Sequence, residues 1–418
     1  MKNIIYLMIL FTGLSACKKD RIVSYEIEKS FQDPTLKFED FKKAIAAGTD
    51  GFQMIIESKS GSICGGYIKF DGAGNAKFVS DNNASNALTP KDTKYSLNVI
   101  QTNSVLGFGK SSSFGLFAAG LAADTSYSYK MSAGDTLKLV GNTSGTNLKL
   151  IKVAKKSGDD YLAGGMSTAM SKWPTLNTFK YYFKRFTVSG KTYDIVINSK
   201  LKYVTINSLV GTSFKRFTTS YVYSSNGITL LQQFVDGTLT VSNLSDLVVS
   251  ANAGTGNAGT NPFTIANAST PLVYDTGAAA AFYAGGSTAI FSGIVSWVSY
   301  TGYTIEGVQD AYGVTTIPGF NYLSFTARYQ PTYDRLGFTA NLALQAYGPA
   351  IPTTIKPNGT IAFSNFGSFG TAAVAIRTIV TNVTNQTVDA LGYYVIQSGP
   401  NQFDLVNVKD GTIWISFE

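Results

Sequence analysis

The residues best suited to contact a carbohydrate gather in one stretch, 297–338, which is dense in Tyr and carries a few charges. A sugar presents apolar C–H faces beside hydroxyl groups, so flat aromatic rings next to carboxylates and an arginine suit it. The pattern selects Trp297 and Tyr303 as ring residues, with polar companions Glu306, Asp310 and Arg328. The alternative is that these tyrosines pack on a β surface with their hydroxyl groups in water.

Cleavage of a sugar chain would need two carboxyl groups, about 5 Å apart in retaining glycosidases and about 6.5–9.5 Å apart in inverting ones. Glu306 and Asp310 are the nearest acidic pair in this stretch. Four residues along a strand span about 13 Å, so only a loop would bring the two together. We therefore assign no catalytic residue and expect binding without catalysis, while a carboxylate-dependent glycoside hydrolase stays an alternative.

A short duplication supplies a second candidate surface. Residues 183–187 and 214–218 both read Phe-Lys-Arg-Phe-Thr, within a segment, 172–216, that holds nine basic residues and one acidic residue. If the two segments form paired strands, alternation of side chains gives a basic stripe composed of Lys184, Arg185, Lys215 and Arg216. Such a stripe suits an anionic polysaccharide or lipid headgroups, and we expect no nucleic acid partner. The alternative is a solvent-facing strand whose charges discourage edge pairing.

The chain has 0 His and 2 Cys among 418 residues, which limits its chemistry. Without histidine, His-dependent triads and most zinc hydrolases are excluded, and two cysteines cannot build a Cys-rich metal site. We expect Cys64 to be a small, half-buried strand residue. Gly254-x-Gly256-x-x-Gly259 matches the dinucleotide fingerprint by letters, but no helix follows it. Residues 251–261 are therefore predicted to be a loop, and we expect neither a cofactor nor a metal.

The N-terminus carries a targeting signal. Lys2 precedes a mostly apolar run, 4–14, which is too short to cross a hydrocarbon layer of about 30 Å but fits a secretory signal. The run ends in Leu14-Ser15-Ala16-Cys17, which resembles the lipobox of bacterial lipoproteins. This resemblance implies cleavage before Cys17 and acylation of that residue, and several acyl chains anchor a protein stably. The alternative is an ordinary signal peptide with an incidental cysteine.

The remaining pattern describes the elements that must position these residues. With 44% apolar and 14% charged residues, the chain has the composition of a folded protein with a sizeable core. Helical spacing of apolar residues predicts one helix over 36–47, ended by Gly48. Alternating Thr, Val, Ile, Tyr and Phe then predict an antiparallel sandwich or barrel. Asn-Gly and Asp-Gly pairs, which favour tight turns, predict hairpins at 226–227, 236–237, 358–359 and 410–411.

A series of short motifs follows the predicted helix in a fixed order across 36–155. The motifs are Gly51-Phe52-Gln53, Gly65-Gly66-Tyr67-Ile68-Lys69-Phe70, Phe78-Val79-Ser80-Asp81, Thr89-Pro90-Lys91, Tyr95-Ser96-Leu97 and Asp135-Thr136-Leu137-Lys138-Leu139-Val140-Gly141. Looser matches follow at Tyr181-Tyr182-Phe183, Gly227-Ile228 and Trp414-Ile415-Ser416-Phe417-Glu418. In these motifs the chain resembles a family of Bacteroidetes outer-membrane lipoproteins known only as a domain of unknown function. Its members commonly carry Trp where this chain has Phe52. The resemblance implies an all-β, barrel-like first domain and an envelope location, and it implies no activity.

We therefore predict a mainly β protein, with an antiparallel barrel-like or sandwich N-terminal domain that has one short helix, followed by a larger antiparallel β region. The predicted division is a signal peptide at 1–16, a lipidated tether at 17–35, the N-terminal domain at 36–155 and the C-terminal region at 172–418. The expected location is the outer membrane, facing either the periplasm or the cell surface.

The expected partners are the membrane, through Cys17, and a glycan or an outer-membrane protein. The first function predicted is non-catalytic binding of an extracellular glycan or another ligand. The alternative is a structural or assembly partner of an outer-membrane complex.

Overall fold

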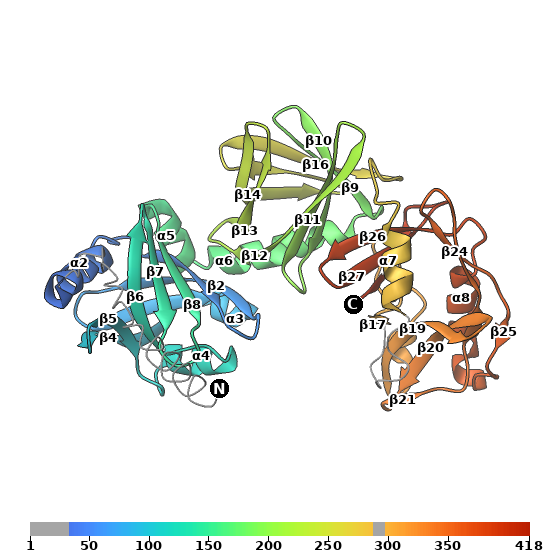
Figure 1. The fold of residues 1–418 in the computed structure, drawn as a ribbon, viewed down its shortest axis with the longest axis horizontal. Helices are drawn as coiled ribbons and strands as arrows, with labels where there is room; N and C mark the ends of the chain where they lie inside the picture. The colour runs from blue at the N-terminus through green and yellow to red at the C-terminus, as the bar shows by residue number, and fades with distance from the viewer. Residues whose placement is uncertain (1–32, 287–296) are drawn as a thin grey trace, which may run out of the picture.

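The structure is a computed structural model that describes residues 33–286 and 297–418. Cys17 and the expected signal peptide lie outside the described residues. The described residues form two closed barrels and a C-terminal module of two sheets, joined by short helices (Figure 1). The predicted fold class, mainly antiparallel β, is confirmed. Among the described residues, no helix combines the length and apolar character needed to cross a membrane.

The first barrel is an antiparallel meander of eight strands in sequence order. It closes because β1 pairs with both β2 and β8, from Phe52 to Glu57 on each side. Its strands are β1 (Phe52–Glu57), β2 (Ile63–Phe70), β3 (Asn75–Ser80), β4 (Lys91–Ile100), β5 (Asn103–Phe108), β6 (Ser126–Ala133), β7 (Thr136–Gly141) and β8 (Asn147–Lys152). Closure leaves no unpaired edge strand.

The predicted helix is α2 (Pro34–Ala46). It begins where the Asp33 carboxylate accepts a hydrogen bond from the Thr35 N–H at 2.8 Å, which is a standard N-cap. Its Phe41 and Ile45 are buried in the core of the first barrel. Two further helices, which the sequence pattern did not indicate, accompany this barrel: α3 (Ala84–Leu88) and α4 (Ser113–Gly120).

The connection between the two barrels is helical. It consists of α5 (Lys155–Leu162), α6 (Gly165–Lys172) and the 3₁₀ helix η1 (Trp173–Thr178), and it covers the segment 155–172 that the sequence indicated as a junction. In Figure 1, α6 lies between the first barrel and the second. Tyr161 and Trp173 of these helices are buried in a core shared with the second barrel.

The second barrel closes with β9 paired to both β10 and β16. Its strands are β9 (Phe183–Val188), β10 (Lys191–Asn198), β11 (Tyr203–Val210), β12 (Ser213–Tyr223), β13 (Gly227–Asp236), β14 (Leu239–Ser250), β15 (Ala253–Ala258) and β16 (Asn261–Ala268). The loop predicted over 251–261 is therefore wrong, because β15 occupies most of it. Glycine is needed at position 256 of this strand, because a Cβ there would lie 2.5 Å from the Ser245 carbonyl oxygen and 2.6 Å from the Phe263 ring.

The Asn-Gly and Asp-Gly pairs all lie at connections between paired strands. Only two of their glycines need a positive φ, Gly237 at 63° and Gly359 at 82°. Gly227 and Gly411 are required for close approach instead, since a Cβ would lie 2.1 Å from the Leu244 carbonyl oxygen and 2.3 Å from that of Ser269, respectively.

The buried carboxylate of Asp81 joins the two barrels. From the first barrel it accepts hydrogen bonds from the Gly65 N–H at 2.8 Å and the Cys64 thiol at 3.1 Å. From the second barrel it accepts hydrogen bonds from Lys202 Nζ at 2.6 Å and the Tyr223 N–H at 2.9 Å. Burial raises the pKa of the Cys64 thiol, which therefore stays protonated and can donate. A buried charge held by donors from both sides fixes the relative placement of the barrels.

Apolar packing surrounds this polar contact. Tyr67 of the first barrel stacks on Tyr161 of α5, with ring centroids 4.8 Å apart. At Gly65 the backbones of the barrels approach so closely that a Cβ would lie 2.5 Å from Val222 Cβ. The barrels therefore share one core across their interface.

The C-terminal module consists of two sheets that pack face to face. The β20 sheet contains β17 (Trp297–Ser299), β19 (Phe320–Gln330), β20 (Tyr333–Ala340), β21 (Ala343–Leu344), β22 (Pro349–Ile351) and β25 (Gly367–Ser368). The β27 sheet contains β18 (Tyr303–Ile305), β23 (Thr353–Ile355), β24 (Ile361–Phe363), β26 (Tyr393–Gly399), β27 (Gln402–Asn407) and β28 (Ile413–Phe417). The helices of the module are α7 (Ala278–Gly285), η2 (Val314–Thr316) and α8 (Val374–Thr387).

The two faces of the β27 sheet have different environments. Alternate residues such as Leu405 and Ile415 face the core of the module. The opposite face carries Val406 and Trp414, which pack against Phe183 and its neighbours at the second barrel. This outer face therefore forms the joint between the second barrel and the C-terminal module.

We expect Asp81→Ala to lower the free energy of unfolding by about 3 kcal/mol or more, because it leaves Lys202 and two backbone N–H groups without their acceptor. The matched control is Asp92→Ala, which removes an ion pair to Lys77 whose side chains are 57% and 79% exposed; it should change the free energy by no more than about 0.5 kcal/mol. Urea unfolding of both variants measures the difference. Equal effects would show that Asp81 does not hold the joint.

Candidate functional site

The aromatic residues selected from the sequence lie in the core of the C-terminal module. Trp297 stacks on Phe282 and donates its Nε1–H to the Phe282 carbonyl oxygen at 2.8 Å. Tyr303 is 2% exposed, and its hydroxyl contacts the Thr387 and Tyr393 hydroxyls. These two rings therefore do not form an open surface on which a sugar could stack.

The polar residues selected with them have separate, local partners. Glu306 pairs with Lys180 at 3.0 Å, and Asp310 accepts a hydrogen bond at 2.6 Å from the N–H of Val314, the first residue of η2. Arg328 lies over the Tyr283 ring at 5.6 Å. The structure thus brings Trp297, Tyr303, Glu306, Asp310 and Arg328 to different places rather than to one site.

The basic stripe is not formed, because the two duplicated segments lie on β9 and β12, which are separated by β10 and β11. Lys184 is buried at the joint with the C-terminal module. Arg185 pairs with Asp194, and Arg216 pairs with Asp275 at 3.6 Å. Lys215 is exposed on β12. The condition for the stripe, that these two strands pair, is therefore not met, because repeated residues do not specify which strands are neighbours.

A chain of three adjoining hollows, which we call the interdomain groove, runs along the joints between the modules. The first, of about 620 Å³, lies between the second barrel and the C-terminal module. The second, of about 500 Å³, shares with it Lys200, Tyr300, Gln402 and Glu418. The third, of about 470 Å³, shares Tyr203 and Pro400 with the second and reaches Glu57 and Lys149 of the first barrel.

The first hollow contains a buried polar cluster. The Tyr182 hydroxyl donates a hydrogen bond to Asp404 Oδ2 at 2.6 Å, and Lys184 Nζ donates to the Tyr182 carbonyl oxygen at 3.0 Å. Burial lowers the pKa of Lys184 to about 8, although the nearby Asp404 acts in the opposite direction. Burial also raises the pKa of the Asp404 carboxyl. The remaining wall carries hydroxyl and amide side chains: Asn177, Thr178, Asn198, Thr301, Thr304, Gln309, Ser398, Gln402 and Ser416.

An exposed aromatic ring stands where the first hollow meets the second. Tyr300 is 46% exposed, and Lys200 Nζ lies 4.5 Å from the centre of its ring. The same ammonium group pairs with Glu418 at 2.5 Å. Tyr300 therefore offers a half-exposed ring where the first two hollows meet.

The charges that line the groove are matched by opposite charges. Lys200 pairs with Glu418, and Glu57 pairs with Lys149 at 2.7 Å. Lys184 lies close enough to Asp404 for each to act on the pKa of the other. Although the chain carries a formal net charge of +8, the groove itself has no excess of either sign.

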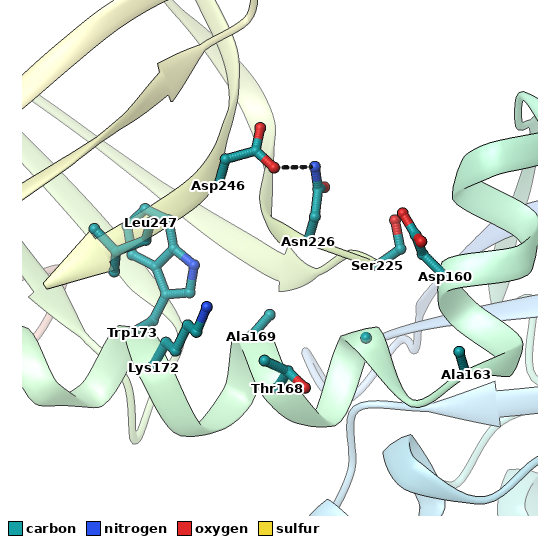
Figure 2. Close-up of a pocket in the computed structure, with 11 residues that line it drawn as sticks. Asp160, Ala163, Thr168, Ala169, Lys172, Trp173, Ser225, Asn226, Asp246 and Leu247 are labelled. Atoms are coloured by element: carbon teal, nitrogen blue, oxygen red, sulfur yellow. Dashed lines mark hydrogen bonds between the residues drawn. The ribbon is translucent and has the colours of Figure 1, made fainter.

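A smaller hollow of about 260 Å³ lies apart from the groove, between the connecting helices and the second barrel (Figure 2). Its Asp246 carboxylate accepts hydrogen bonds from Asn226, Ser245 and Asn257, and its Asp160 pairs with Lys156. This hollow shares no lining residue with the other three, whereas those three form one continuous groove, so we place the candidate site in the larger groove.

Sequence reasoning missed the residues that line this groove. Asp404 lies within an alternating strand pattern, and Tyr300 is one of 24 tyrosines. Two signals were available: Lys184 in the duplicated motif, which was selected for a different surface, and the aromatic stretch 297–338, which contains Tyr300. The groove is formed by segments more than 200 positions apart, such as those that contain Tyr182 and Asp404.

Comparison with known proteins identifies a family but no activity. The model of the family described as "Domain of unknown function (DUF4302)" matches residues 35–246. The search of curated proteins gave no match.

Comparison with solved structures gave low similarity. A DnaN sliding clamp from Bartonella birtlesii aligns at 8% identity over 91% of this chain and 96% of the clamp, with a TM-score of 0.14. The DNA polymerase III beta chain of Streptococcus pneumoniae aligns at 10% identity over 91% and 97%, with a TM-score of 0.13. Such TM-scores do not establish a shared fold, and no function follows from them.

The buried Lys184 ammonium group should make stability depend on pH. An unfolded lysine loses its proton near pH 10.4, whereas folded Lys184 loses it near pH 8. Between these values the unfolded state binds more protons, so the free energy of unfolding rises with pH, by at most about 1.4 kcal/mol per unit. Below pH 8 both states hold the proton, and this contribution is constant.

Lys184→Met should remove this rise, so the stability of the wild type relative to the variant should increase from pH 7 to pH 9.5. Taking this difference cancels contributions from other groups such as Cys64. Lys77→Met, which removes an exposed ammonium group, is the control and should run parallel to the wild type. A constant difference between wild type and Lys184→Met would contradict the burial argument.

Proposed function

The chain belongs to the DUF4302 family of domains of unknown function, and from that premise we propose that it is a lipid-anchored protein of the cell envelope that binds an extended, neutral carbohydrate chain. The interdomain groove is the proposed binding site. In this proposal the protein is an outer-membrane lipoprotein of the kind found in Bacteroidetes, anchored through Cys17.

The observation that carries the proposal is the continuity of the three hollows. Each shares lining residues with the next, from the C-terminal module to Glu57 and Lys149 of the first barrel. A single small ligand would need only one hollow, whereas a chain of sugar units can occupy several in succession. The hydroxyl and amide side chains that line the groove can donate to and accept from sugar hydroxyls.

The paired charges of the groove favour a neutral chain. An anionic polysaccharide would need cations that are free to meet it, but Lys200 and Lys149 are each paired with a glutamate. An anionic chain would have to displace those glutamates, and the two ion pairs would then be lost. We therefore propose a neutral polysaccharide as the ligand, rather than the anionic polysaccharide that the basic segments of the sequence suggest.

Tyr300 is the ring best placed to stack on a sugar. We expect Tyr300→Ala to weaken binding about tenfold, which corresponds to about 1.4 kcal/mol. Isothermal titration with xylan, mannan, laminarin and pullulan, set against alginate and heparin, measures this. The matched control is Phe366→Ala, which removes another exposed ring of the C-terminal module, 60% exposed and outside the groove; its affinity should equal that of the wild type.

Two results would contradict this function. Tighter binding of alginate or heparin than of the neutral polysaccharides would refute the neutral ligand. Binding of none of them, together with stoichiometric cross-linking to a membrane protein in cells, would favour the alternative function of an assembly partner.

The lipid anchor is tested separately at Cys17. Mass spectrometry of protein purified from the native host should find a mature chain that begins with an acylated Cys17, because the sequence before it resembles a lipobox. Cys17→Ser should move the protein from the detergent phase to the aqueous phase in Triton X-114 partitioning. An intact Met1 or an unmodified Cys17 thiol in the native material would exclude the anchor.

A further inference from the structure

One lysine of the second barrel reaches across the joint to the ring on which the proposed binding depends. Lys200 lies in the connection between β10 and β11. Its Nζ lies 4.5 Å from the centre of the Tyr300 ring and 2.5 Å from Glu418 Oε1. Tyr300 and Glu418 belong to the C-terminal module, so a single ammonium group contacts two side chains on the other side of the joint. All three residues line both the first and the second hollow.

The backbone is held on both sides of this contact. In the C-terminal module, the Val298 N–H donates to the main-chain oxygen of Glu418 at 3.0 Å, and the Glu418 N–H donates to the Val298 carbonyl oxygen at 2.9 Å. Tyr300 follows Val298 by two residues, so its ring and the Glu418 carboxylate start from the same part of the module. On the barrel side, the Asn198 amide donates a hydrogen bond to Gln402 Oε1 at 3.0 Å, which holds the neighbouring segment of the barrel against the module.

The Tyr300 ring depends on few contacts for its orientation. Besides the Lys200 ammonium group, the Tyr322 ring meets it at an interplanar angle of 84°, with ring centres 6.2 Å apart. The residue is otherwise 46% exposed. A cation over the face of an aromatic ring is attracted to it and restricts the rotation of the side chain. A ring that is already held loses less conformational freedom when a sugar stacks on it, so binding is tighter.

We propose that Lys200 is a positioning residue for carbohydrate binding in the interdomain groove: it holds the Tyr300 ring and does not itself contact the sugar. This inference rests on the proposed carbohydrate binding. The Lys200 side chain is 66% exposed, and both a cation–π contact and an ion pair are weak at exposed positions. We therefore expect its loss to weaken binding less than the loss of the ring, by about threefold.

The test is a double-mutant cycle on the full chain, with isothermal titration against the same neutral polysaccharides. Lys200→Met should weaken binding about threefold when Tyr300 is present. In the Tyr300→Ala background the same substitution should have no effect, because the ring that the lysine holds is absent. Lys200→Arg keeps a cation that stacks on aromatic rings, so it should restore the affinity of the wild type.

Lys180 provides the matched control, because it makes the same two kinds of contact away from the groove. It pairs with Glu306 at 3.0 Å, and its Nζ lies 5.8 Å from the centre of the Tyr181 ring. Lys180 is not among the residues that line the three hollows. Lys180→Met should therefore bind like the wild type, which controls for the loss of one positive charge.

The outcomes separate this inference from the proposed function. Equal affinities of the wild type and Lys200→Met overturn the positioning role and leave the binding function in place. The same loss in both backgrounds also overturns it, because the lysine would then act independently of the ring. Binding by Lys200→Arg that is as weak as that of Lys200→Met shows that a cation over the ring is not what matters, and it overturns the role too. A wild type that binds none of the polysaccharides overturns the proposed function and this inference with it. A loss that depends on Tyr300 and is rescued by arginine supports the inference.

Discussion

The carboxylate of Asp81 determines how the first two barrels meet, and the groove depends on that placement. A charge with no access to water must be satisfied by protein donors, and here they come from both barrels, through Gly65 on one side and Lys202 and Tyr223 on the other. Rotation of either barrel would leave the charge and several donors unpaired, so one arrangement is strongly preferred. The third hollow has walls from both barrels and therefore keeps its shape only while this contact holds.

The two joints of the molecule differ in how completely they are packed. At the first joint, Gly65 allows the backbones to approach so closely that even a methyl group would collide with Val222. At the second joint, Trp414 and Phe183 pack together, but the polar residues beside them face a hollow of about 620 Å³. A joint that leaves space beside buried polar groups provides a place for a ligand. The largest of the three hollows therefore lies at the second joint, and the groove runs from there towards the first barrel.

The sequence predicted where strands and turns occur better than it predicted which strands pair with each other. Period-two alternation correctly indicated antiparallel strands, and Asn-Gly and Asp-Gly pairs correctly indicated hairpin connections, because both are local signals. Strand partners depend on closure, which is not local, so the duplicated segments around Lys184 and Arg216 could not be placed. Tyr303, selected from the sequence as a sugar-binding ring, illustrates the same limit: alternation indicates a strand but does not tell which side of two packed sheets is inside. The pattern around Gly256 indicates a loop, because the contacts that require glycine there come from other strands and are not visible in the sequence.

The extent of the family match, compared with the topology, shows where the groove belongs. The match ends at residue 246, within β14 (Leu239–Ser250), yet the second barrel closes only when β16 pairs with β9. A chain cut at 246 would expose the edges of β9 and β14, which is unfavourable for a barrel, so the folding unit in this chain extends at least to Ala268. The β27 sheet, which supplies Asp404 to the first hollow, lies wholly beyond the match. The first hollow therefore needs the C-terminal module as well as the second barrel, and a relative without that module would lack its walls.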